Sequence, residues 1–161
     1  MNMLTKVAVA VDGSHASWRA LEAALEWLGD QGEVLIVDVK DIVAFVQPIA
    51  PTTYGGSSMA SLETLLEEWD ANAEKVREQA MAMVKKTGIT AQWQVVTIQD
   101  GEMHAAQAFL EAAIKAKAQA VVAGRHHGSA WIEGLFGSFP RWLATHASLP
   151  VVIIPPSQDA S

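Results

Sequence analysis

Short valine-rich segments alternate with segments of helical spacing along the chain, and this alternation constrains the fold more than any other feature. It predicts a parallel sheet with helices on both faces. Continuous apolar runs such as VAVAV and VVIIP fit strands that are buried on both sides. We therefore expect a single open α/β sheet of five strands. The expected strands are 5–11, 33–39, 90–98, 118–123 and 151–154, and the expected helices lie around 18–28, 62–84, 109–114 and 141–147.

The chain has no internal repeat, and its 161 residues favour one domain. We expect that domain to span residues 1–156 and residues 157–161 to form a disordered tail. The one long connection, Asp41–Ala60, carries two prolines and a Gly-Gly pair. Connections of this length are functional lids or mobile surface loops, and both interpretations stay open. Three tryptophans at helical positions predict packing in the core or under the loops: Trp18, Trp27 and Trp69.

Charge and composition exclude several classes of partner. The formal net charge is −7 and no basic stripe occurs, so we expect no nucleic-acid partner. The chain has no cysteine, which excludes disulfides and thiolate metal sites. The adjacent His126 and His127 lack a nearby third ligand, so we expect no metal site. No apolar run reaches the roughly 20 residues of a membrane helix, so we expect no membrane insertion and a cytoplasmic location.

Two loops carry the residues that are best suited to a ligand. In an open parallel sheet, ligands bind beyond the carboxyl ends of the strands, where the strand order reverses. The Asp12 carboxylate can accept hydrogen bonds from a ribose or an adenine amino group, or can simply be a turn or cap residue. Gly124 follows the fourth strand and allows a close backbone approach. Gly137 and Ser138 open the last helix, whose N–H groups can bind phosphate.

These elements resemble the universal stress protein family over nearly the whole chain. The similarity is carried by VAVDGS with Ser17 three residues on, by the glycine loop that ends in GS before a helix, and by the final strand PVVIIP. The resemblance implies a Rossmann-like fold, similar to the adenine nucleotide alpha hydrolases, with the strand order 3-2-1-4-5. It also implies a homodimer that pairs through strand five, Val151 to Ile154. An uncovered apolar edge strand favours the same pairing.

Part of that family binds ATP through a loop of the form G-x2-G-x9-G-[ST]. Aligned on Gly137 and Ser138, the first glycine falls on Gly124 and the second on His127. Gly128 lies one residue after the position of that second glycine. In one interpretation Gly128 takes the turn, and His126, His127 and Arg125 add donors to the phosphates. In the other, the His127 ring fills the site, because histidine adopts a positive φ only at a cost. The second strand also departs from the family, with Asp38-Val39 where many relatives carry His-Val.

The resemblance thus implies a regulatory protein of the stress response that binds an adenine nucleotide. ATP is the expected ligand, with AMP or another adenine nucleotide as alternatives. The implied contacts are Asp12 and Val39 to the adenosine, and Gly124, Arg125, Gly128, Gly137 and Ser138 to the phosphates. Mg²⁺ would arrive with the nucleotide.

We expect no enzymatic activity beyond slow ATP hydrolysis, because no poised base or nucleophile is visible. The alternative function is a nucleotide-free interaction protein that meets a protein client through its dimer surface and the 41–60 loop. An adenylate-transferring enzyme ranks last, because such enzymes need added motifs or domains.

Overall fold

The computed structural model describes residues 4–42, 58–99, 101, 103–125 and 138–155. Its five strands form one parallel sheet in the order β3-β2-β1-β4-β5, as expected. The strands are β1 (Lys6–Ala10), β2 (Glu33–Asp41), β3 (Thr90–Ile98), β4 (Ala120–Gly124) and β5 (Val151–Ile154). Several residues that the sequence singles out lie outside the described part: His126, His127, Gly128, Gly137, the tail 157–161, and residues 43–57 of the long connection.

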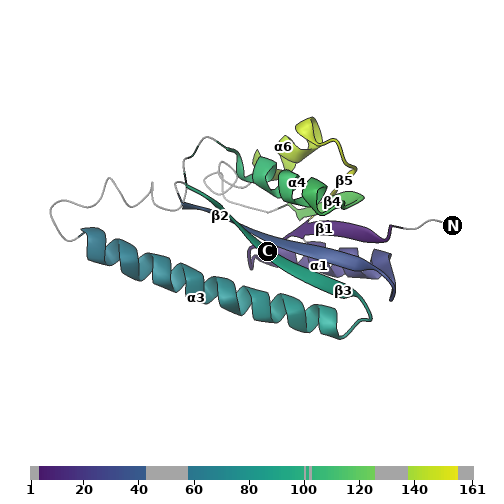
Figure 1. Cartoon of the computed structure of the whole chain (residues 1–161), viewed down its shortest axis with the longest axis horizontal. Coiled ribbons are helices and arrows are strands. Elements are labelled where there is room, and N and C mark those ends of the chain that lie inside the picture. Colours follow the sequence, from purple (N-terminus) through teal and green to yellow (C-terminus); the bar gives the residue numbers. More distant parts are fainter. Residues whose placement is uncertain (1–3, 43–57, 100, 102, 126–137, 156–161) are drawn as a thin grey trace.

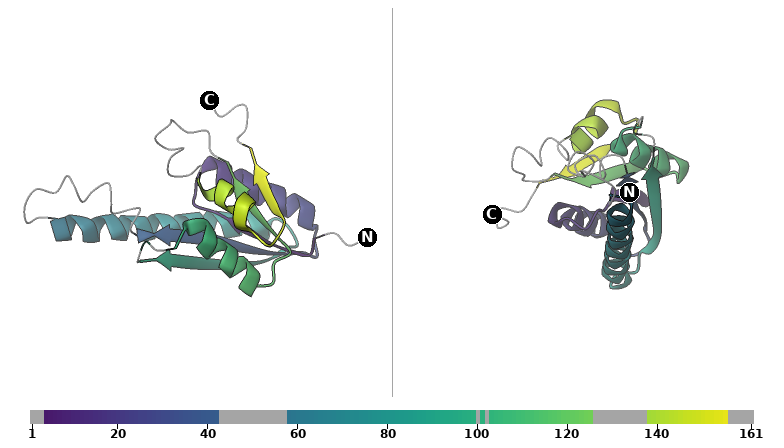
Figure 2. Two further views of the ribbon diagram at one scale, coloured as in Figure 1. Left: turned by 90° about the horizontal axis from the view of Figure 1, so that it is seen from above. Right: turned by 90° about the vertical axis from the view of Figure 1, so that its left-hand side faces the viewer.

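Helices cover both faces of the sheet, which confirms the expected three-layer arrangement (Figures 1 and 2). Helices α1 (His15–Leu28) and α3 (Ser58–Lys85) pack on one face, against Val7, Val9 and Ile36. Helices α4 (Ala105–Lys115) and α6 (Ser138–His146) pack on the other, against Ala8, Leu35 and Val37. Successive strand residues point to opposite faces, so each central strand contributes to both cores.

Helix α3 is longer than the sheet that it covers. Figure 1 shows its first turns running on beyond the carboxyl ends of the strands. Among the side chains of α3 that the structure describes, those from residue 63 on, the buried apolar ones all lie in its second half: Ala73, Val76, Ala80 and Val84. In the first half, Leu65, Leu66 and Trp69 are half-buried. No described helix has the length and apolarity needed to span a membrane.

The expected burial of Trp27 is wrong, because its side chain is 37% exposed. Leu21, Leu25 and Leu28 form the buried stripe of α1. A residue next to Leu28 in sequence is turned about 100° away from that stripe, since a helix has 3.6 residues per turn. Trp18 does pack against the core beneath α1. Helical spacing identified the helix, but it did not fix which tryptophan faces inward.

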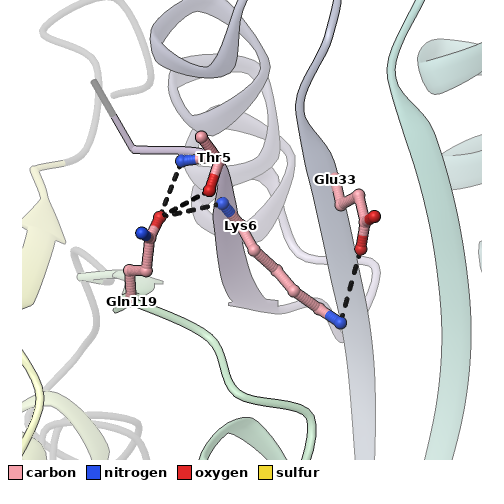
Figure 3. Close-up of polar contacts among 4 residues, drawn as sticks. All are labelled: Thr5, Lys6, Glu33 and Gln119. Carbon is pink, nitrogen blue, oxygen red and sulfur yellow. Dashed lines mark hydrogen bonds and ion pairs between the residues drawn. The ribbon is translucent and has the colours of Figure 1, made fainter. Parts of the chain in front are cut away.

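The two central strands are joined by side chains at the amino edge of the sheet. The Gln119 Oε1 atom, just before β4, accepts hydrogen bonds from the Thr5 N–H at 2.7 Å and from the Lys6 N–H at 3.1 Å (Figure 3). The Lys6 ammonium also lies 3.4 Å from a carboxylate oxygen of Glu33 on β2. These contacts fix β1 beside β4, and the strand order reverses at this pair. The opposite, carboxyl edge of the same pair is where a ligand is expected.

Candidate functional site

The candidate site lies at the carboxyl edge of β1, β2 and β4. Strand β1 pairs with β2 on one side and with β4 on the other. Helices α1, α4 and α6 each follow a strand of a parallel sheet, so their N-termini open toward this same edge. Helix N-termini carry unpaired N–H groups and a partial positive charge. The carboxyl edge of the sheet therefore gathers three helix N-termini.

The turn after β1 places Asp12 at this edge in a fixed conformation. The Asp12 Oδ1 atom accepts a hydrogen bond from the Ser14 N–H at 2.8 Å, and Ser14 caps α1 by accepting from the Ser17 N–H at 3.2 Å. Gly13 has φ +87°, and an added Cβ there would lie 2.7 Å from Val76 on α3. The cap of α1 and the neighbouring helix α3 therefore both constrain the turn. Asp12 itself is exposed to solvent.

Val39 presents a peptide group toward the end of β1. The Val11 N–H donates to the Val37 carbonyl at 2.9 Å. Within the described residues, no further main-chain bond joins the chain after Val11 to β2. Peptide groups of alternate strand residues face opposite neighbours, so the Val39 N–H and C=O point to the same side as those of Val37. There β1 has already ended, and a ligand can take the place of the next strand residue.

Gly124 is placed at the end of β4, as the sequence predicts, but its neighbours give it a packing role. A Cβ on Gly124 would lie 2.4 Å from the carbonyl oxygen and 2.6 Å from the carbonyl carbon of Ala16. The first turn of α1 thus rests on the backbone of β4. Arg125 follows with an exposed side chain, and its N–H donates to the Ile154 carbonyl at 2.8 Å. The main chain of β4 stays bonded to β5 up to this point.

Ser138 begins α6, and this helix is fastened to α4 by ring contacts. The Trp142 ring stacks between His104, at a centroid distance of 5.7 Å, and His146, at 4.5 Å. His104 also caps α4, because its Nδ1 accepts from the Ala106 N–H at 3.0 Å. Burial lowers the pKa of His104, which keeps the ring neutral and Nδ1 free to accept. Since Ser138 is one turn before Trp142, the stack sets where the N-terminus of α6 lies.

Asp38 also lies at this edge. In the sequence it stands out only as a departure from the family pattern. It lies in β2 one residue before Val39 and is 6% exposed. Burial raises its pKa to about 6; Lys40 works against that shift and the Asp12 carboxylate adds to it. The signal in the sequence is one acidic residue inside the apolar segment VLIVDV. Two carboxyl groups, one exposed and one buried, therefore stand together beside the Val39 peptide.

The structure brings together four of the seven site residues expected from the sequence, namely Asp12, Val39, Gly124 and Arg125, through β1, β2 and β4. Ser138 is placed at the start of α6, on the same edge. Gly128 and Gly137 lie outside the described residues. So does His127, which stands where the family motif has its second glycine. Among the described residues no group of three or more His, Asp or Glu side chains forms a metal site.

Comparison with known families matches this chain to a described family over almost all of its length. The model of the universal stress protein family matches residues 3–155. No curated protein sequence is similar enough to count as a relative. The match covers every described strand and helix, including both loops of the candidate site.

Solved structures give the same result for the fold. A protein of the universal stress protein family from Burkholderia pseudomallei is 25% identical, covers 98% of this chain and 99% of its own, and has a TM-score of 0.71. A universal stress protein in complex with cAMP is 20% identical over 97% of this chain and 100% of its own, at 0.60. One from Arabidopsis thaliana with AMP bound is 19% identical over 96% and 94%, at 0.62. The last two likenesses establish the fold alone.

Proposed function

Because the chain belongs to the universal stress protein family, we propose that it binds an adenine nucleotide at the carboxyl edge of its sheet and acts as a regulator in the stress response. The observation that carries this proposal is the Val39 peptide, which faces the end of β1 beside the Asp12 carboxylate. A peptide N–H and C=O side by side match the acceptor and donor on the amino-bearing edge of adenine. Relatives of the same fold with AMP and with cAMP lend support.

In this proposal the nucleotide lies across the point where the strand order reverses. Asp12 and Val39 contact the adenosine. Gly124, Arg125, Gly128, Gly137 and Ser138 contact the phosphates, with the N-terminus of α6 contributing its N–H groups. ATP is the proposed ligand, and Mg²⁺ accompanies its phosphates rather than binding to a protein cage.

The proposal is one of binding and regulation, with slow ATP hydrolysis at most. One hydroxyl that contacts Asp12 in the turn is that of Ser17, which is only 5% exposed. Its Oγ donates to the Ser14 carbonyl at 2.9 Å and accepts from the Asp12 N–H at 3.3 Å. A hydroxyl held in this way completes the cap of α1 and is not positioned to attack a phosphate.

Replacing Asp12 with asparagine tests the proposed site. Asparagine keeps an oxygen for the Ser14 N–H, so the turn is retained while the negative charge is lost. We expect ATP with Mg²⁺ to bind the unchanged protein in calorimetry, and the variant to bind about tenfold more weakly, since a hydrogen bond to a charged group is lost. Asp30→Asn is the matched control, because Asp30 is exposed between α1 and β2, at the opposite edge.

The protein stock is first denatured and checked by its absorbance for nucleotide that has co-purified. If the stock is empty and ATP gives no heat, the nucleotide proposal is overturned. The alternative, an interaction protein without a nucleotide, would then be favoured. Equal weakening by Asp12→Asn and Asp30→Asn would remove Asp12 from the site while leaving ATP binding in place.

We further propose a homodimer that pairs through the outer edge of β5. In the sheet β5 pairs with β4 alone, and the Pro150 and Ile154 carbonyls bond back to β4. The peptide groups of the alternate residues, Val151 and Ile153, therefore face away from the sheet. An unpaired apolar edge is a site for a second chain, and a two-fold partner is the simplest one.

Ile153→Pro is expected to turn the dimer into a monomer in light scattering at micromolar protein, because it removes an outward N–H. Ile153→Ala loses the same side-chain packing but keeps that N–H, and it should remain a dimer. A monomeric parent protein, or a dimer that survives the proline, would contradict pairing through β5.

A further inference from the structure

The Asp38 carboxylate is buried without a hydrogen bond in the described part of the chain. It is 6% exposed and follows four buried apolar residues of β2. Neither a main-chain N–H nor a side-chain donor of the described residues bonds to it. A buried carboxylate without a partner costs folding free energy. An ionisable group that lowers stability and lies beside a candidate ligand site is a candidate for a role in that site.

The nearest cation does not neutralise Asp38, because it is held by another element. The Lys40 ammonium forms an ion pair with the Asp70 carboxylate of α3 and lies 5.8 Å from the centre of the Trp69 ring. The charged groups that act on Asp38 are Lys40 from β2 and Asp12 from the loop after β1, and Lys40 is itself paired with Asp70 of α3. Two of these three are negative, so the surroundings favour a ligand group that donates hydrogen bonds.

Solvent can reach the Asp38 oxygen atoms. No described residue has a fully buried side-chain polar atom that lacks a hydrogen-bond partner. Because the carboxylate of Asp38 lacks such a partner, its oxygens cannot be fully enclosed. Asp38 lies in the second half of β2 and directly precedes Val39. A ligand group bound to the Val39 peptide would thus be a direct neighbour of the Asp38 carboxylate.

We propose that Asp38 recognises the ribose of the bound nucleotide by accepting hydrogen bonds from its hydroxyl groups. This inference rests on the proposed nucleotide site and deepens it. An ionised carboxylate is an acceptor only, and the two neighbouring ribose hydroxyls are donors that it can bind together. In dinucleotide-binding folds with the same β-α-β start, an acidic residue about 20 residues after the first turn takes this role. Asp38 follows the Asp12 turn at a similar distance.

Asp38→Ala removes the acceptor, and its effect is read with ATP and 2′,3′-dideoxy-ATP as paired probes. We expect the unchanged protein to bind ATP about tenfold more tightly than the dideoxy form, as one charge-assisted hydrogen bond provides. Asp38→Ala should bind both with equal affinity. Asp41→Asn is the matched control, since Asp41 is on the same strand with its side chain on the opposite face, and it should keep the preference.

A second measurement uses the unchanged protein and needs no variant to fold. The pKa of Asp38 is raised to about 6, so the carboxylate is ionised at about pH 7.5 and mostly protonated at about pH 5. We expect the preference for ATP over the dideoxy form to shrink across this range. A purely structural role for Asp38 would weaken both probes together and leave their ratio constant with pH.

The outcomes separate this inference from the function on which it rests. No binding of ATP overturns both. ATP binding with equal affinity for the two probes, or a preference that survives Asp38→Ala, overturns the ribose contact alone. A loss of affinity for both probes in Asp38→Ala also overturns it, because the carboxylate would then contact the base. A preference that is lost in Asp38→Ala, kept in Asp41→Asn and reduced toward pH 5 supports it.

Discussion

Gly124→Ala is expected to lower the free energy of unfolding by about 3 kcal/mol, because the new Cβ would overlap the backbone of α1. The atoms in the way are the carbonyl oxygen and carbon of Ala16, at 2.4 and 2.6 Å. A flexible side chain could rotate away, but a helical carbonyl moves only with its helix. Relief of the clash would shift α1 off the sheet and with it the turn that carries Asp12. Urea unfolding of the two proteins measures the difference.

Gly29→Ala provides the comparison that isolates this effect. Gly29 has φ +65° and nothing within 4 Å of an added Cβ, so alanine there meets only the conformational penalty, about 1 kcal/mol. Gly124 is not among the glycines with a positive φ, so its cost is steric alone. We expect Gly124→Ala to be clearly the more destabilising of the two. A loss at Gly124 no larger than that at Gly29 would mean that α1 can move away freely.

This packing changes what a glycine motif can be taken to mean. The sequence places Gly124 at the first position of a phosphate-binding pattern, and that pattern suggests a ligand at its backbone. In the structure the space of the missing side chain is occupied by α1 itself. Gly124 would thus be needed to seat α1 even without a nucleotide, and its presence alone does not distinguish the two proposed functions.

The fold could be predicted from the sequence because its signal is local and periodic. Runs of valine in β1 and β5 and steps of three and four in α1 and α4 each need only their own segment to be recognised. The strand order needed more, since spacing does not say which strands are neighbours. It came from the family resemblance, and the pairing of β1 with both β2 and β4 confirms it. The prediction for Trp27 was wrong because Trp27 is next to Leu28 and therefore lies off the buried stripe of α1.

The candidate site was predictable only in part, and Asp38 marks the limit. Asp12 and Gly124 follow strands directly, so the rule that ligands meet the carboxyl ends of strands places them at once. Asp38 lies inside a strand. A charged residue after a run of apolar ones is typical of the point at which a strand becomes exposed to solvent. The side chain of Asp38 lies on the face of the sheet that α1 and α3 cover, as that of Ile36 does, so its burial depends on the assembled fold.

Asp38→Asn is expected to stabilise the protein by about 2 kcal/mol at about pH 7.5. The pKa of Asp38 is raised from 3.8 in the unfolded chain to about 6 in the fold. Above both values the folded protein must hold the ionised form in a site that disfavours it, and about two pKa units correspond to nearly 3 kcal/mol. Asparagine has the same shape without the charge, and some of the gain is lost because its buried amide also needs partners.

The dependence of this gain on pH distinguishes it from a general effect of the substitution. At about pH 7.5 the gain is fully present. It declines as the pH falls from about 6 toward 3.8, and it vanishes only at about pH 3, where the carboxyl is protonated in both states. Urea unfolding of both proteins across this range gives the difference directly. A gain that is constant with pH, or a loss at neutral pH, would show that the Asp38 carboxylate has a stabilising partner. A pH-dependent gain joined to a lost ribose preference would identify Asp38 as a residue that costs stability and serves binding.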